Sequence, residues 1–153
     1  MIQEVSASNL SLTRDCAFSF FKESKLPGNF NWDHWKASWE QIIGKGMGLI
    51  FAYFPNEEDK KIGGVLGGIA AHCLNTGDLE IFETFWYMLP EHRGTPAAIR
   101  LLRAFELWGE KIGAKRVKMA YLREVNGETV RNMYERLGYN EQETTFRKEI
   151  SEP

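Results

Sequence analysis

The chain lacks most of the features that mark secreted, membrane-spanning or nucleic-acid-binding proteins. It has only two cysteines, Cys16 and Cys73, and their apolar neighbours predict buried, reduced thiols rather than a disulfide framework. No apolar run approaches the roughly 18 residues of a membrane-spanning helix. The formal net charge of −2 leaves no basic excess for a nucleic-acid surface. We therefore expect a cytoplasmic protein with neither a membrane nor a nucleic-acid partner.

Metal-ligand spacing is also missing. The three histidines, His34, His72 and His92, have no cysteine or histidine at the intervals of a structural metal site, so no metal is expected. By contrast, apolar residues make up 43% of the chain and aromatic residues 13%, which is enough for a substantial core. No repeat or low-complexity segment divides the chain, so residues 1–153 are expected to form one domain.

Hydrophobic periodicity predicts an alternation of strands and helices. Strands are expected over residues 2–7, 49–54, 61–73, 79–89 and 116–122, and residues 139–150 are expected to form a final strand or hairpin arm. Helices are expected from Ser11, from Asn31 or Asp33, from Thr95 to Gly113, and over residues 126–137. The strand–loop–helix–strand order over residues 79–122 is long enough for one right-handed crossover between parallel strands.

Two of these strands have an unusual composition. Residues 79–89 carry large apolar side chains on both faces, which is typical of a central strand covered on both sides. The preceding strand contains four glycines, Gly63, Gly64, Gly67 and Gly68. Glycine inside a strand often marks a bulge or a close backbone approach, so irregular pairing is expected here.

The loop after residues 79–89 has the composition of an anion-binding helix N-terminus. Thr95 suits the N-cap and Pro96 suits the first helical position. The N–H groups that would converge on a phosphate or pyrophosphate belong to Gly94, Thr95, Ala97 and Ala98. Gly94 has no Cβ, so an anion can approach its backbone closely. An ordinary capped loop before a helix is the structural alternative.

Two motifs on either side of residues 116–122 carry a resemblance to a known family. Residues 85–94, FWYMLPEHRG, lead from an aromatic strand into the loop, and residues 133–139, MYERLGY, end the last helix. With Leu101-Leu102 in the helix between them, this pattern resembles the GNAT superfamily of N-acetyltransferases. In that family Pro-x-x-Arg-Gly-x-Gly-x-Gly/Ala follows an aromatic strand, and Tyr-x-x-x-Gly-Phe/Tyr ends a later helix. The resemblance covers nearly the whole chain and extends to acetyltransferases encoded by bacteriophages.

The resemblance implies an α/β (α+β) fold, with a central mixed, splayed sheet of about six to seven strands and about four flanking helices. It implies acetyl-CoA as co-substrate, a primary amine as acceptor, no metal, and a homodimer as an arrangement that the family adopts. The loop from Arg93 to Ala98 would then hold the pyrophosphate, and the strand before it would pair with the pantetheine amides. The residues expected to bind the co-substrate are Trp86, Tyr87, Met88, Arg93, Gly94, Thr95, Ala97 and Ala98.

Amine acetylation needs a general base for the amine and an acid for the leaving thiolate. Glu80 and Glu83 are the candidate bases, because a carboxyl among the apolar residues of strand 79–89 should have a raised pKa. The two face opposite sides of a regular strand unless a bulge intervenes, and an edge-exposed or ion-paired carboxylate is the alternative for each. Tyr134 matches the family tyrosine that acts as the acid, and a core tyrosine with a bonded hydroxyl is its alternative. Tyr121 is a second candidate phenol.

Three positions depart from the family pattern and bear on the binding of coenzyme A. Pro96 replaces the second loop glycine and has no N–H, although the Thr95 hydroxyl is a candidate substitute. Glu91 stands where glutamine or arginine is common, and a carboxylate pointing inward there would repel a pyrophosphate. The helical asparagine expected seven residues before the tyrosine falls on Gly127, with Asn126 one place away.

The resemblance implies an acceptor region along residues 26–35, because the first two helices of the family and their loop often line the acceptor site. The loop after residue 122 is also placed to contact an acceptor. The candidate acceptor contacts in that loop are Arg123, Glu124 and Asn126. The tryptophans within and after the first stretch have near-helical spacing, so they are expected to pack against the sheet: Trp32, Trp35 and Trp39. A net charge near zero argues against polybasic or polyanionic acceptors through long-range steering.

Two classes of function remain open. The first is an N-acetyltransferase that acts by direct transfer on a primary amine of a small molecule or protein. The second is a catalytically degenerate binding or regulatory protein of the same fold that acts through a protein partner, because a fold does not determine a function. Pro96 and Glu91 motivate the second class, since both lie in the expected co-substrate site.

Overall fold

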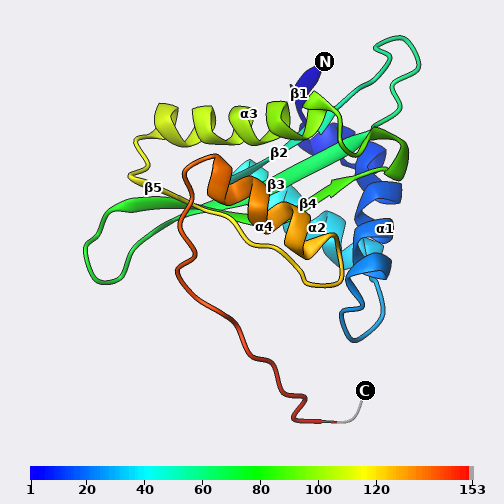
Figure 1. Ribbon diagram of the computed structural model, residues 1–153. Coiled ribbons are helices and arrows are strands. Elements are labelled where there is room, and N and C mark those ends of the chain that lie inside the picture. The colour runs from blue at the N-terminus through cyan, green and yellow to red at the C-terminus, as the bar shows by residue number, and fades with distance from the viewer. Residues whose placement is uncertain (152–153) are drawn as a thin grey trace.

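A five-stranded sheet forms the centre of the computed structural model, which describes residues 1–151 (Figure 1). Residues 152 and 153, the end of the expected domain, lie outside the described part. The strands follow the chain order β1-β2-β3-β4-β5, and each neighbouring pair is antiparallel except β4 and β5, which are parallel. The strands are β1 (Ile2–Glu4), β2 (Gly48–Tyr53), β3 (Gly64–His72), β4 (Leu79–Met88) and β5 (Arg116–Lys118).

Four α-helices flank the sheet, as the resemblance implied. Helices α1 and α2 cover one face, and α3 and α4 lie on the other (Figure 1). Two short 3-10 helices lie in the connections. The helices are η1 (Ala7–Thr13), α1 (Arg14–Ser24), α2 (Trp32–Gly44), η2 (Pro90–His92), α3 (Pro96–Ile112) and α4 (Gly127–Arg136). Helix α3 connects β4 to β5, which makes the expected crossover between parallel strands.

The helix ends agree with the sequence in three places and differ in one. Asn31 caps α2, because its side-chain oxygen accepts the His34 N–H at 3.0 Å. Thr95 is the N-cap residue of α3 by position, and Gly113 ends that helix in the left-handed conformation at φ 84°. The expected cap at Ser11 is wrong: Ser11 lies inside η1, and α1 starts only after Thr13.

A β-bulge in β4 decides which of its side chains face which helices. Gly67 pairs with Phe85 and Gly68 with Glu83, so Thr84 is an extra residue without a partner in β3. Before the bulge, Ile81 packs in the core between the sheet and α3. After the bulge, Phe85 packs in the core on the opposite face, between the sheet and helices α1 and α2. The glycines permit this approach, because a Cβ at Gly68 would overlap the Phe105 ring and the Phe82 carbonyl. The expected irregular pairing is confirmed.

Two expected strands are corrected by the structure. Residues 139–150 form no strand and extend away from the sheet (Figure 1), so the sheet has five strands rather than six to seven. A strand needs a paired neighbour, and β5, the last strand of the sheet, is only three residues long. Strand β5 itself ends at Lys118 rather than at residue 122, because the chain beyond it diverges from β4.

The structure also bears on the two cysteines and on the helix lengths. Cys16 is buried as expected, whereas Cys73 is half-buried just after β3; both thiols are free. Within residues 1–151, none of the helices combines the length and the apolar character that crossing a membrane requires.

Candidate active site

The parallel strands β4 and β5 separate after three residue pairs and open a cavity. Pairing joins residues 80–82 to residues 116–118 and stops there, so β4 from Glu83 to Met88 has no strand neighbour on that side among residues 1–151. The gap leads into a cavity of about 490 Å³, a usual size for a small-molecule site. The lining residues are Phe20, Leu26, Glu83, Thr84, Trp86, Tyr87, Met88, Arg93, Gly94, Thr95, Ala98, Ile99, Ala120, Tyr121, Leu122, Val125, Asn126, Thr129, Val130, Met133, Tyr134 and Arg136.

Glu83 lies at the point where the two strands separate. Its Oε2 accepts the backbone N–H of Ala120 at 3.2 Å, so a side chain of β4 holds the chain just beyond β5. Burial raises the pKa of Glu83 from 4.5 to about 7, although the hydrogen bond from Ala120 offsets part of the rise. The side chain is only half-buried by exposed area, since it opens onto the cavity. A carboxyl of this kind exchanges protons near neutral pH, which suits a general base.

Tyr134 of α4 bonds the other backbone group of Ala120. Its hydroxyl donates a hydrogen bond to the Ala120 carbonyl at 2.8 Å, and its ring lies 6.0 Å from Trp86 and 5.5 Å from Tyr139, centroid to centroid. Burial, with smaller contributions from Glu83 and Tyr139, raises the pKa of Tyr134 well above its ordinary value. The phenol therefore stays protonated at neutral pH. Ala120 thus links the candidate base through its N–H and the candidate acid through its C=O.

The N-terminus of α3 presents backbone N–H groups at the cavity. Gly94 adopts φ 75°, and open space surrounds the position of a Cβ there. Within residues 1–151, no acceptor contacts the N–H of Gly94 or Thr95, and the first N–H groups of any helix lack helical acceptors. The Thr95 hydroxyl donates to the His92 carbonyl at 2.7 Å, so in this conformation it does not supply the donor that Pro96 lacks.

Arg93 connects the loop before α3 to helix α1. Its Nε donates to the Met88 carbonyl at 3.0 Å, its Nη2 donates to Glu23 Oε2 at 2.8 Å, and its guanidinium lies 5.3 Å from the Tyr87 ring centroid. Glu23 also accepts the Tyr87 hydroxyl at 3.0 Å. The arginine therefore contributes to the cavity wall while its charge is compensated within the chain. Glu91 is exposed and does not line the cavity, which removes the expected repulsion from the site.

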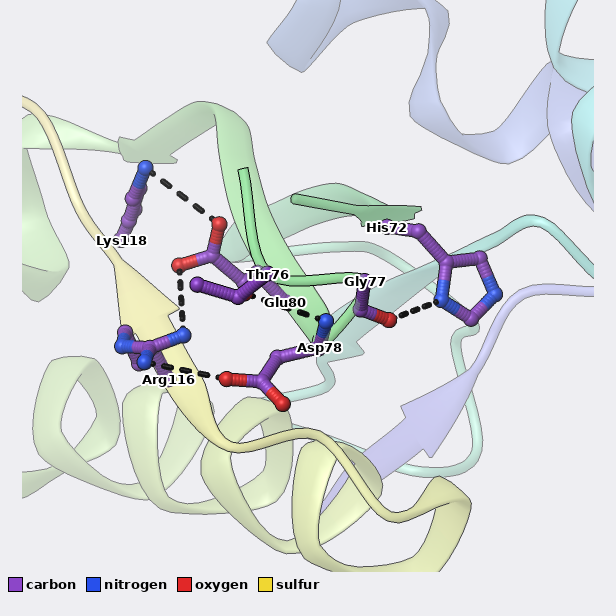
Figure 2. A network of polar contacts seen from close by, with 7 residues as sticks. All are labelled: His72, Thr76, Gly77, Asp78, Glu80, Arg116 and Lys118. Atoms are coloured by element: carbon purple, nitrogen blue, oxygen red, sulfur yellow. Dashed lines mark hydrogen bonds and ion pairs between the residues drawn. The ribbon is translucent and has the colours of Figure 1, made fainter. Parts of the chain in front are cut away.

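Glu80, the other candidate base, lies outside the cavity in a separate cluster of charges. Figure 2 shows its carboxylate between two cations of β5, with Arg116 Nη1 and Lys118 Nζ each 3.6 Å away. The residue is buried, with 3% exposure, and Arg116 also pairs with Asp78 at 3.1 Å. The bulge at Thr84 lies beyond both glutamates, so it does not bring Glu80 to the side of Glu83. This environment matches the ion-paired alternative, and we keep Glu83 alone as the proposed base.

Some of the remaining candidate site residues line the cavity and others do not. Leu26, Tyr121 and Asn126 line the cavity, whereas Arg123 and Glu124 do not. The tryptophans of α2 do not line it either: Trp39 is buried in the core, and Trp35 packs edge-on against Phe85. Ala97 is buried at the start of α3 and also lies off the cavity wall.

Several lining residues were not anticipated from the sequence, among them Thr84, Phe20 and Arg136. Thr84 is the bulged residue of β4, and its hydroxyl donates to the Gly67 carbonyl at 3.0 Å. Phe20 enters from α1, and Arg136 ends α4 inside the motif at residues 133–139. The glycine pair in β3 was a signal for Thr84. Phe20 had no local signal, because only the packing of α1 against β4 brings it to the cavity.

A family model described as "Acetyltransferase (GNAT) family" matches residues 12–139, most of the chain. The chain belongs to the GNAT acetyltransferase family. Solved structures agree with this GNAT fold. A predicted acetyltransferase with acetyl-CoA from Clostridium acetobutylicum superposes with a TM-score of 0.80 at 12% identity, covering 98% of this chain and 96% of that one.

Two further GNAT-fold neighbours have named acceptors. The aminoglycoside antibiotic 6'-N-acetyltransferase of Acinetobacter haemolyticus has a TM-score of 0.70 at 19% identity, and 99% of each chain is covered. The glucosamine-6-phosphate N-acetyltransferase of Arabidopsis thaliana has a TM-score of 0.74 at 14% identity, covering 99% of this chain and 98% of that one. At such identities the likeness shows a common fold. No curated protein sequence matches this chain.

Proposed function

We propose that this chain is an N-acetyltransferase that moves an acetyl group from acetyl-CoA directly to a primary amine, with residues 1–153 acting as one domain. The observation that carries the proposal is that Glu83 and Tyr134 bond the two backbone groups of one residue, Ala120, at the cavity where β4 and β5 separate: Glu83 accepts its N–H and Tyr134 donates to its C=O. One group takes up protons near neutral pH and the other retains its proton. Amine acetylation needs both.

The residues present fit coenzyme A as a ligand. The unpaired side of β4, from Glu83 to Met88, offers backbone groups of the kind that pair with the amides of pantetheine. The open backbone at Gly94 and the N-terminus of α3 suit an anion, which the helix dipole also favours. Arg136 lines the same cavity and is a further candidate for phosphate contact. Pro96 removes one donor from this set without blocking the approach at Gly94.

Glu83 acts as the base in this proposal. Its carboxylate takes a proton from the acceptor ammonium, directly or through a water, and the nitrogen lone pair then becomes available. Acetyl-CoA supplies an activated acyl group, whose C–S bond breaks as the C–N bond forms, with the electron pair left on sulfur. A base with a pKa near the working pH is suited to this step, because it is largely ionised and still accepts a proton.

Tyr134 acts as the acid. In the structure its hydroxyl proton points to the Ala120 carbonyl, and in the reaction it is given to the departing sulfur. The tyrosine regains a proton from the newly bonded nitrogen, directly or through water. The balance is one ammonium and one thioester consumed, with one amide, one thiol and one released proton formed.

A catalytically degenerate binding protein is the second candidate. Pro96 lacks an N–H, the Thr95 hydroxyl is bound to His92, and the Arg93 charge is compensated by Glu23. Each of these weakens the site for a pyrophosphate. This candidate therefore requires weak or absent binding of coenzyme A, which a direct measurement can decide.

Isothermal titration of the purified protein with acetyl-CoA and with CoA tests the proposal. We expect saturable binding at micromolar concentration, and at least tenfold weaker binding by Gly94→Trp. Gly77→Trp is the matched control, since both glycines have φ 75° and open space at the Cβ position, but Gly77 lies in the β3–β4 loop away from the cavity. No binding up to millimolar concentration would reject the acetyltransferase and favour the second candidate.

A further inference from the structure

We propose that the acceptor is a primary amine with a single positive charge and an aromatic or branched aliphatic body. This inference rests on the proposed function and adds the class of amine to it. It follows from the charges and apolar groups in the part of the cavity that lies away from the N-terminus of α3.

The cavity has two parts, which different elements line. Beside α3 and α4 it is bordered by Gly94, Thr95 and Ala98, the part suited to the co-substrate. On the face covered by α1 it is bordered by Phe20 and by Leu26 just after that helix. The segment between β5 and α4 lines the cavity through Ala120, Tyr121, Leu122, Val125 and Asn126. Apart from the Tyr121 hydroxyl and the uncharged amide of Asn126, the side chains of the second part are aliphatic and aromatic.

Carboxylates that could hold additional ammonium groups are scarce in this part. Among the described residues that line the cavity, Glu83 is the only carboxylate. Glu23 lies nearby on α1, but it accepts hydrogen bonds from Arg93 at 2.8 Å and from the Tyr87 hydroxyl at 3.0 Å. Glu124 follows β5, but Lys25 Nζ lies 3.2 Å from its Oε2. The chain's own cations and hydroxyl therefore compensate the neighbouring acids.

These charges select against polycationic acceptors. A second or third ammonium group would lie against apolar walls without a counter-charge, which is unfavourable. An apolar acceptor body instead binds more tightly, because contact with Phe20, Leu26 and Leu122 removes its apolar surface from water. The single ammonium that remains is the one that Glu83 deprotonates.

Initial rates of the full chain at saturating acetyl-CoA test this selection. We compare 2-phenylethylamine and isoamylamine with spermidine and kanamycin at one pH and one ionic strength. The expected result is a kcat/KM at least tenfold higher for the two monoamines. A preference for the polycationic amines overturns the inference while the acetyltransferase assignment stands. Binding of acetyl-CoA with no turnover of either monoamine also overturns it, whereas a failure to bind acetyl-CoA rejects the proposed function itself.

Substitutions at Leu26 test the wall directly. Leu26→Asp should lower kcat/KM for 2-phenylethylamine about tenfold and raise it for spermidine, because an apolar contact is lost and a counter-charge is gained. Leu26→Asn should lower kcat/KM for 2-phenylethylamine without raising kcat/KM for spermidine. Leu74→Asp is the control, since this leucine is fully exposed in the β3–β4 loop. Val125→Asp repeats the test on another wall if Leu26→Asp does not fold. An unchanged preference in a folded variant contradicts the inference.

Discussion

Replacing Glu83 with glutamine should change activity and stability in opposite directions. The amide has nearly the same size, and its oxygen can still accept the Ala120 N–H, but it cannot take up a proton. Loss of a general base lowers rates by about 100- to 10,000-fold, so kcat/KM should fall by at least about 100-fold. In the unsubstituted protein kcat/KM should rise with pH and level off above about 7, the pKa to which burial raises Glu83.

The stability effect has a definite sign. Because the pKa of Glu83 is higher in the folded than in the unfolded chain, the folded state binds more protons between pH 4.5 and about 7, and stability falls as pH rises through that window. Each tenfold change in proton affinity corresponds to about 1.4 kcal/mol, which gives an upper limit of about 3 kcal/mol. Water at the half-exposed carboxyl reduces this, so we expect Glu83→Gln to raise the free energy of unfolding at pH 8 by about 1–2 kcal/mol.

Urea unfolding at pH 4 and pH 8, with rate measurements across the same range, checks both effects. Glu80→Gln is the matched control from the same strand, because it removes a carboxylate bound to Arg116 and Lys118 outside the cavity. That variant should lose stability while the midpoint of its pH–rate profile stays in place. If Glu83→Gln retains activity, or if it does not gain stability at pH 8 relative to pH 4, the assigned environment of Glu83 is refuted.

Two further predictions concern other parts of the fold. Tyr134→Phe should lower kcat about 100-fold with little change in acetyl-CoA affinity. Tyr139→Phe, which removes the hydroxyl of the neighbouring ring, should keep kcat within a few-fold of the value for the unsubstituted protein. Equal losses of kcat in the two variants would reject the acid role of Tyr134. Gly68→Ala should lower the free energy of unfolding by about 1–3 kcal/mol, because its Cβ meets the Phe105 ring, while Gly44→Ala, with open space at that position, should cost nothing measurable in urea unfolding.

Features that depend on neighbouring residues were predictable from the sequence. The cap of α2 at Asn31, one of its two candidates, the start of α3 at Thr95 and Pro96, and the irregular pairing of the glycine-rich strand all arise from local backbone chemistry. The hydrophobic periods also placed β4 as a strand covered on both faces, since the alternation of side chains is a property of a few successive residues.

Features that depend on residues far apart in the chain were not predictable from the sequence. Glu80 and Glu83 are equivalent in sequence, and only the end of the β4–β5 pairing separates an ion-paired carboxylate from one that opens onto a cavity. Likewise, Arg93 binds Glu23, 70 positions earlier in the chain.

By itself, the amino-acid sequence determined most of the helices and strands and the two motifs that place the chain in its family, because these depend on residues only a few positions apart. The tertiary structure alone decided which carboxylate serves the cavity, that Ala120 bonds both that carboxylate and Tyr134, and that residues 139–150 have no strand partner. Each of these depends on free energies set by burial, pairing and charge between segments that meet only after folding.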